Sequence, residues 1–142
     1  DSVAFMDNPL VMIGPVGHAM SRLDHVSMLD LKDKTFLMRE EGSGTRIAVE
    51  RFCSSEGVSL SASGMEMNSN EGIKQGVQAG LGLGVVSIHT VEAELETGRL
   101  VLINAEGFPI QRQWFVVNRK GKRLSATARA FREFVINEGA KL

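Results

Sequence analysis

The sequence contains one cysteine, Cys53, and no tyrosine, and these shortages limit what the protein can be. A single thiol cannot form an internal disulfide, which fits a reducing compartment, and the expected location is the cytoplasm. The three histidines, His18, His25 and His89, share no metal-ligand spacing, so neither a metal nor a cofactor is expected. No apolar run approaches the length that spans a bilayer, and no membrane association is expected.

An excess of either charge is also missing. The chain has 16 basic and 17 acidic residues, a formal net charge of −1, and therefore no broad basic surface for nucleic acid. The one dense cationic run, RKGKR at residues 119–123, is expected to be an exposed loop before a helix. A length of 142 residues with 43% hydrophobic and 23% charged residues is ordinary for one globular domain.

Hydrophobic patterning and turn residues predict an α/β chain in which strands alternate with helices. Such alternation favours a mainly parallel sheet covered on both faces. Strands are expected at residues 9–13, 35–39, 60–67, 85–88, 100–103 and 114–118. Helices are expected at residues 28–32, 46–55, 91–96 and 126–137, and from the cap at Asn68 onwards. Ser27, Thr90 and Ser125 are the expected caps of three of these helices.

The most informative stretch is NSNEGIKQGVQAGLGLGVVSIHTV, which begins at Asn68. Asn68 can cap a helix, and Glu71 is spaced to complete a capping box. Gly72, Gly76 and Gly80 leave one flank of that helix almost without side chains, so another element can pack very close to it. The order helix, glycines, strand is the reverse of a dinucleotide or phosphate loop, and a tight connection between helix and strand is expected.

One segment has the polarity of an anion-binding turn. The strand at 35–39 is followed by Gly42, Ser43 and Gly44, and a helix starts at Thr45 or just after it. Such a turn directs free backbone N–H groups and the positive end of the helix dipole beyond the carboxyl end of the strand. The hydroxyls of Ser43 and Thr45 add donors to this turn.

Two arginines flank the same turn, and their role stays open. Arg39 or Arg46 could hold a carboxylate or phosphate through a bidentate contact. Alternatively, Ser43 only caps the helix and Arg46 pairs with Glu50 one turn later.

A second polar cluster, Asn68, Ser69 and Asn70, also follows a strand and starts a helix. In an open α/β sheet both clusters would lie at the carboxyl edge, where ligands bind. Together they indicate a binder of small anionic molecules. No catalytic residues are expected, because Cys53 lies on an apolar helix face and no acid–base pair can be assembled.

Several segments together resemble a known family. They are PLVMIGPVGHAM, FLMREEGSGTR, MNSNEGIKQGVQAGLGLGVVSIHTV, GRLVLI, WFVVNRK and LSATARAFREFV. These resemble the effector-binding domain of LysR-type transcriptional regulators over about residues 7–135. The sequences DNPLVMI, REEGSGTR and SNEGIKQGV are most similar to those of regulators of carbon-fixation (RuBisCO) operons. Ala19 departs from the pattern, because the family usually has proline after the histidine that stands here as His18.

The resemblance implies the two-lobed periplasmic-binding-protein type II fold, with the second lobe and the crossover strands present and the first lobe incomplete. Residues 1–17 would be the first crossover strand and an edge of lobe I, and residues 18–113 would be lobe II. Residues 114–142 would be the second crossover strand and the helix that returns to lobe I. A serine- and threonine-rich turn of lobe I, which supplies half of the family's ligand contacts, has no counterpart in the sequence.

The family's effector contacts match this sequence at Gly14, Pro15, Glu41, Gly42, Ser43, Gly44, Thr45, Asn68 and Ser69. The implied effector is an anionic metabolite such as a sugar phosphate, phosphoenolpyruvate or a nicotinamide dinucleotide. The resemblance also implies a homodimer or homotetramer, and contact with DNA only through a helix-turn-helix domain that this chain lacks. A periplasmic-type solute-binding protein or an enzyme domain of the same fold is the alternative.

Overall fold

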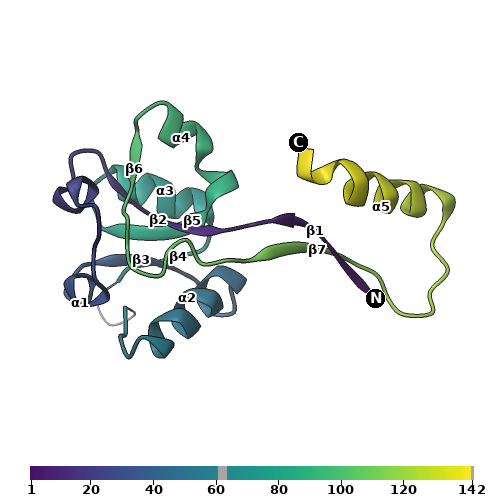
Figure 1. The fold of residues 1–142 in the computed structure, drawn as a ribbon, viewed down its shortest axis with the longest axis horizontal. Coiled ribbons are helices and arrows are strands. Elements are labelled where there is room, and N and C mark those ends of the chain that lie inside the picture. Colours follow the sequence, from purple (N-terminus) through teal and green to yellow (C-terminus); the bar gives the residue numbers. More distant parts are fainter. Residues whose placement is uncertain (61–63, 142) are drawn as a thin grey trace. The chain divides into compact units, whose positions relative to one another are not determined.

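The computed structural model describes residues 1–60 and 64–141, and its contacts divide the chain into two compact units (Figure 1). Unit 1 consists of Asp1–Pro9 and Gln111–Leu142, and unit 2 is Leu10–Ile110. In the described part of the chain, no helix is both long enough and apolar enough to cross a bilayer.

Unit 2 is built on a five-stranded sheet with the order β4-β3-β5-β2-β6. Its strands are β2 (Leu10–Pro15), β3 (Phe36–Arg39), β4 (Glu66–Met67), β5 (Leu83–Ser87) and β6 (Leu100–Leu102). β3 is parallel to β4 and β5, whereas β2 is antiparallel to both β5 and β6. Four strands therefore run one way and one runs against them, which confirms a mainly parallel sheet with a single reversed strand.

Helices cover both faces of this sheet (Figure 1). α1 (Met28–Leu31) and α2 (Gly44–Ser55) cover one face, and α3 (Asn70–Gln78) and α4 (Glu92–Glu96) cover the other. Side chains alternate between the two cores along β2: Leu10 and Met12 are buried on the α2 side, whereas Val11 and Ile13 pack on the α3 side. This alternation is the period-two pattern of a strand buried on both faces.

α3 packs unusually close to the sheet because glycines stand at the contact. A Cβ added at Gly76 would lie 2.5 Å from Cδ1 of Leu37, and one added at Gly84 would lie 2.6 Å from Cγ2 of Ile73. The helix ends where Gly80 takes a φ of 80°, a conformation that favours glycine. The expected glycine flank and the tight connection from helix to strand are both confirmed.

The two ends of unit 2 are paired with each other. Leu10 and Ile110 exchange backbone hydrogen bonds in both directions, each with an N···O distance of 2.9 Å. Leu10 also lies opposite Ser87, the last residue of β5. The chain therefore enters and leaves unit 2 at the edge where β5 ends.

Unit 1 contains an antiparallel pair of strands, β1 (Ser2–Asp7) and β7 (Gln113–Val117), and the helix α5 (Ala126–Glu138). As expected, Ser125 caps α5 and accepts a hydrogen bond from the backbone N–H of Ala128. Several large apolar side chains of the unit are exposed: Trp114, Phe115, Val117, Phe131 and Phe134.

Some expected element boundaries were wrong. The expected strand at 9–13 continues through Gly14 and Pro15, because both residues pair with β6. β1 was not expected at all. Of the expected strand at 60–67, only Glu66–Met67 is a strand among the described residues, and residues 61–63 lie outside them. In α2, Val49 and Cys53 are buried, whereas Ile47 is 40% exposed and does not face the core.

Two expected caps were also wrong. Ser69, not Asn68, caps α3, because its side chain accepts from the N–H of Gly72. Glu71 does not complete a capping box and instead accepts a hydrogen bond from the side chain of Gln75. Thr90 does not cap α4, since its hydroxyl donates to the carbonyl of Ser87. The expected cap of α1 by Ser27 is confirmed, with a full capping box.

The two units meet between Pro9 and Leu10 and between Ile110 and Gln111. β2 belongs to the sheet of unit 2, because it hydrogen-bonds to β5 on one side and to β6 on the other.

Candidate ligand-binding site at the carboxyl edge of the sheet

The two polar turns predicted from the sequence leave the sheet of unit 2 side by side. β3 and β4 are parallel neighbours, and Arg39, the last residue of β3, lies opposite Met67, the last residue of β4. The turn after β3 leads through Ser43 into α2, and the turn after β4 leads through Ser69 into α3. The expectation that both turns lie at one carboxyl edge is confirmed.

The first turn is held by its own backbone and by Ser43. The N–H of Ser43 donates to the carbonyl of Glu40 at 3.1 Å, and Gly42 takes a φ of 85°. The Ser43 hydroxyl accepts from the N–H of Arg46 at 3.5 Å, so the capping role is present. Because a hydroxyl also carries a donor hydrogen, capping leaves Ser43 able to donate to a ligand. Thr45 lies in the first turn of α2 and is half-buried.

The second turn is similar in construction. The Ser69 hydroxyl accepts from the N–H of Gly72 at 3.0 Å, while Asn68 is exposed. Asn70 is the first residue of α3, and its Oδ1 accepts a hydrogen bond of 2.7 Å from Nη1 of Arg39. This bond from the end of β3 to the start of α3 joins the two turns directly.

Both guanidinium groups at this edge are engaged by carboxylates. Arg39 makes a bidentate contact with Glu40, with Nε–Oε2 at 2.7 Å and Nη2–Oε1 at 2.8 Å. Arg46 pairs with Glu50 at 2.7 Å and with Glu66 at 2.8 Å, and its Nη1 also donates to the carbonyl of Arg39. The pairing of Arg46 with Glu50, one of the two roles left open by the sequence, is present.

These contacts shift the titration of the groups involved. The hydrogen bond from Arg39 lowers the pKa of Glu40, and the same bond raises the pKa of Arg39. Hydrogen bonds to Glu50 and Glu66 raise the pKa of Arg46. Arg39, Glu40 and Arg46 are therefore held in their charged forms at neutral pH.

Gly14 and Pro15 do not join this group. Because β2 runs against its neighbours, its last residues pair with Val101 and Leu100 at the beginning of β6. They therefore lie at the amino edge of the sheet, opposite the edge formed by Arg39 and Met67. Glu41 lies in the first turn with Gly42 and is exposed.

The contacts of Glu40 and Asn70 with Arg39 at this edge of the sheet were not predicted from the sequence. Both residues lie in the two polar turns that were predicted, but neither was considered as a partner of Arg39. The adjacent opposite charges of Arg39 and Glu40 were the available signal, whereas the contact to Asn70 joins residues far apart in the sequence.

The single thiol and two of the imidazoles are engaged in local structure. Cys53 is 3% exposed, and burial raises the pKa of its thiol to about 11, so it is not an activated nucleophile. His18 accepts a hydrogen bond from the N–H of Met20, and Nδ1 of His89 lies 3.2 Å from a carboxylate oxygen of Glu92. Within residues 1–60 and 64–141, no group of three His, Cys, Asp or Glu side chains could hold a metal ion.

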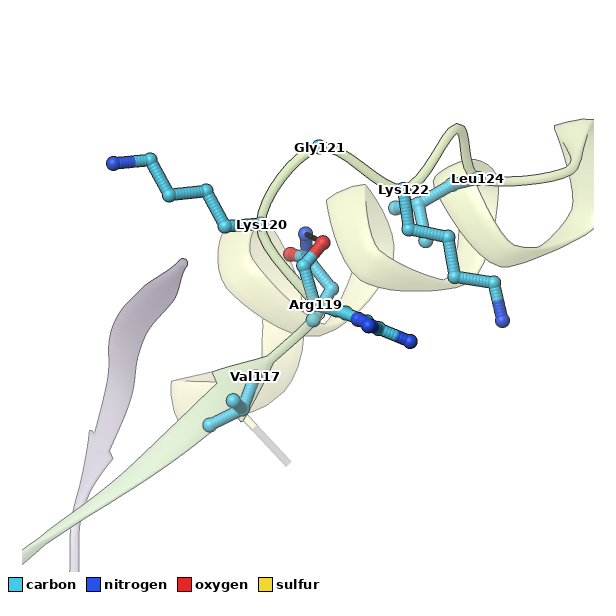
Figure 2. Close-up of a pocket in the computed structure, with 7 residues that line it drawn as sticks. Val117, Arg119, Lys120, Gly121, Lys122 and Leu124 are labelled. Carbon is cyan, nitrogen blue, oxygen red and sulfur yellow. Dashed lines mark hydrogen bonds between the residues drawn. The ribbon is translucent and has the colours of Figure 1, made fainter.

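A separate open hollow of about 730 Å³ lies in unit 1 along the loop between β7 and α5. Its cationic lining residues are Arg119, Lys120 and Lys122, which belong to the exposed run expected from the sequence. Figure 2 shows Lys120 and Lys122 extending in different directions from the loop rather than towards a common point. The loop therefore presents positive charge to solvent.

Comparison with known proteins agrees with this architecture. The model of the family "LysR substrate binding domain" matches residues 1–140. The chain is 55% identical over 142 residues to a RuBisCO operon transcriptional regulator of Allochromatium vinosum, covering all of this chain and 47% of that protein. It is 44% identical over 137 residues to the HTH-type transcriptional regulator CbbR of Sinorhizobium medicae (strain WSM419), covering 96% of this chain and 44% of that protein.

A solved structure is similar as well. The CcmR regulatory domain of Synechocystis PCC6803, in complex with 2-PG, matches with a TM-score of 0.87 and 34% identity, covering 96% of this chain and 65% of that one. The chain spans about half the length of the curated relatives it matches, 47% and 44% of the two named above. Its sequence match and its α/β architecture, of the periplasmic-binding-protein type II, agree with each other, and the chain belongs to the LysR substrate binding domain family.

Proposed function

We propose that the chain is the effector-binding domain of a transcriptional regulator that controls a carbon-fixation operon. The named relatives support this, since they are RuBisCO operon and CbbR regulators. On this proposal the parent protein is cytoplasmic, is not an enzyme, and contacts DNA through a helix-turn-helix domain outside this chain.

The observation that carries the proposal is the pair of turns at one sheet edge. Two helix N-termini, those of α2 and α3, follow parallel neighbouring strands, and Arg39 connects them through Asn70. Backbone N–H groups at such ends, together with the hydroxyls of Thr45 and Ser69, are donors suited to an anion. A small anionic metabolite, such as a sugar phosphate, phosphoenolpyruvate or a nicotinamide dinucleotide, fits this donor set. The complex of the similar CcmR domain with 2-PG supports a small-molecule effector.

Effector binding acts by changing how the protein assembles. A ligand shifts the equilibrium between two arrangements of an oligomer only by the difference between its affinities for them. In a homodimer or homotetramer, an effector that favours one arrangement of the domains would alter how the DNA-binding parts meet the promoter.

The proposal is tested with phosphoenolpyruvate as the probe. In a titration of the 142-residue chain followed by backbone amide NMR, we expect residues 42–45 and 68–70 to shift together. Thr45→Val should weaken binding by about 1 kcal/mol or more, roughly fivefold, the effect of one lost hydrogen bond.

Thr35→Val is the matched control, because Thr35 immediately precedes β3 at the opposite edge of the same sheet. It should leave the affinity unchanged. Shifts confined to other parts of the chain would contradict the proposed site. An unchanged affinity in Thr45→Val would leave Thr45 with a structural role in the first turn of α2.

A further inference from the structure

We propose that Glu40 is an internal competitor of the effector at this site: its carboxylate occupies the Arg39 guanidinium and must be displaced by the effector. The inference rests on the proposed function, because it concerns how an anion reaches the same edge of the sheet. It adds a threshold, namely that an anion gains the Arg39 guanidinium only by taking the place of the Glu40 carboxylate.

The geometry of Glu40 is that of a bound carboxylate ligand. Its two oxygens lie 2.7 and 2.8 Å from Nε and Nη2 of Arg39, the parallel two-bond contact that a guanidinium makes with carboxylate or phosphate. The edge of Arg39 best suited to an external anion is therefore already filled by a residue of the same chain.

The charge balance of the edge leads to the same conclusion. Arg39 and Arg46 contribute two positive charges, and the carboxylates that contact them, Glu40, Glu50 and Glu66, contribute three negative ones. An incoming anion would meet a net negative cluster while these pairs stay intact. Binding is favourable only if one carboxylate moves away from its guanidinium.

Glu40 is the carboxylate best placed to leave. Arg46 is fixed by two carboxylates and by the carbonyl of Arg39, so freeing it breaks several contacts. Arg39 keeps its bond from Nη1 to Asn70 when Glu40 leaves, and Asn70 stands at the start of α3. The guanidinium thus stays aimed at the edge, and Nε and Nη2 become free for a ligand. Glu40 sits in the turn outside β3 and α2, so its side chain can rotate without moving either element.

Displacing Glu40 costs the same free energy whichever anion takes its place, so the contact weakens the binding of every anion that engages Arg39. A phosphate group carries about −1.5 to −2 charges at pH 7 and has three acceptor oxygens, so it offsets this cost better than a monocarboxylate does. Removing the charge of Glu40 should therefore tighten the binding of a phosphate-bearing ligand without creating a new contact.

The test measures the binding of phosphoenolpyruvate to the 142-residue chain by amide NMR titration. In Glu40→Gln we expect the affinity to rise by roughly threefold or more, because a neutral amide competes less well than a carboxylate for Nε and Nη2 of Arg39. Glu66→Gln is the matched control, because it removes the same charge from the same cluster but from the other guanidinium. It should raise the affinity less than Glu40→Gln does.

The outcomes separate this inference from the proposed function. If phosphoenolpyruvate shifts the two turns but binds no more tightly to Glu40→Gln than to the unchanged chain, the inference is wrong and the site stands. An equal rise in affinity in Glu66→Gln would show a general effect of charge and would also overturn it. If phosphoenolpyruvate shifts the turns in no variant, both the inference and the proposed site are wrong.

Discussion

Nζ of Lys74 lies 2.7 Å from Oε1 of Glu94, so an ion pair joins α3 to α4 on one face of the sheet. Lys74 is 8% exposed and also contacts Glu71 at 3.1 Å. Burial alone would lower the pKa of Lys74, but the hydrogen bonds to Glu94 and Glu71 more than offset it, and the pKa is raised. The hydrogen bond from Lys74 lowers the pKa of Glu94. The pair is therefore charged over the whole neutral range.

Glu94→Gln is expected to lower the free energy of unfolding by about 1–3 kcal/mol, because it leaves the largely buried Lys74 with a weaker partner. Urea unfolding followed by circular dichroism measures the change. Glu138→Gln is the control, since Glu138 makes an ion pair with Lys141 in which both side chains are well exposed. That substitution should stay within about 0.5 kcal/mol of the unchanged chain. Equal effects of the two substitutions would contradict a special role for the buried pair.

The same pair predicts a loss of stability in acid. The folded pKa of Glu94 lies below its ordinary value of 4.5, so the unfolded chain binds its proton more readily. The stabilisation is complete above pH 4.5 and is lost as the pH falls through the folded pKa. For Lys74, whose folded pKa lies above 10.5, the loss comes only as the pH rises above that value. The free energy of unfolding, measured between pH 6 and pH 3, should decrease less steeply with falling pH in Glu94→Gln than in the unchanged chain. The same pH dependence in both would argue against this linkage.

Cys53 should resist alkylation in the folded protein. With a pKa of about 11, only about one thiol in a thousand is a thiolate at pH 8, against about one in ten at the ordinary value of 9.0. Its 3% exposure also limits access. Mass spectrometry after iodoacetamide treatment should show slow labelling in buffer and rapid labelling in guanidinium. Comparable rates in the two solutions would mean that the α2 face opens readily.

Unit 1 should promote self-association of the chain. Its apolar side chains are well exposed, with Phe115 at 53% and Phe131 at 66%. Leaving such area in water is unfavourable by roughly 25 cal/mol per Å², and a two-stranded sheet has unpaired edges. Sedimentation velocity should show an association that rises with concentration and weakens in Phe131→Ser. Leu29→Ser, at a residue of α1 in unit 2 that is 69% exposed, is the control. A monomer at every concentration would contradict the prediction.

The elements predicted best from the sequence were those with local chemical signals. Ser27 and Ser125 were identified as caps because a capping side chain bonds to the backbone three residues away. Asn68 and Ser69 are both good caps, and the error of one residue between them reflects that equivalence. β1 was missed because its partner, β7, lies more than a hundred residues away and no local pattern records that pairing.

The candidate site was predicted in outline but not in its contacts. The turns at Ser43 and Ser69 follow parallel strands, and that order was visible in the sequence. The direction of β2 was not, since the residues of a strand do not encode which way it runs in a sheet, and this direction puts Gly14 and Pro15 at the edge opposite these turns. The bond from Arg39 to Asn70 depends on the register between β3 and β4, which only the folded sheet defines.

The reversed direction of β2 decides where the chain enters and leaves unit 2. It brings Leu10 to the edge at which β5 ends, and Ile110 is joined to Leu10 by two backbone hydrogen bonds of 2.9 Å. The turns at Ser43 and Ser69 follow the ends of β3 and β4, which are at this same edge of the sheet. Both chain segments that connect unit 2 to the rest of the molecule therefore start from the edge at which we propose that the effector binds.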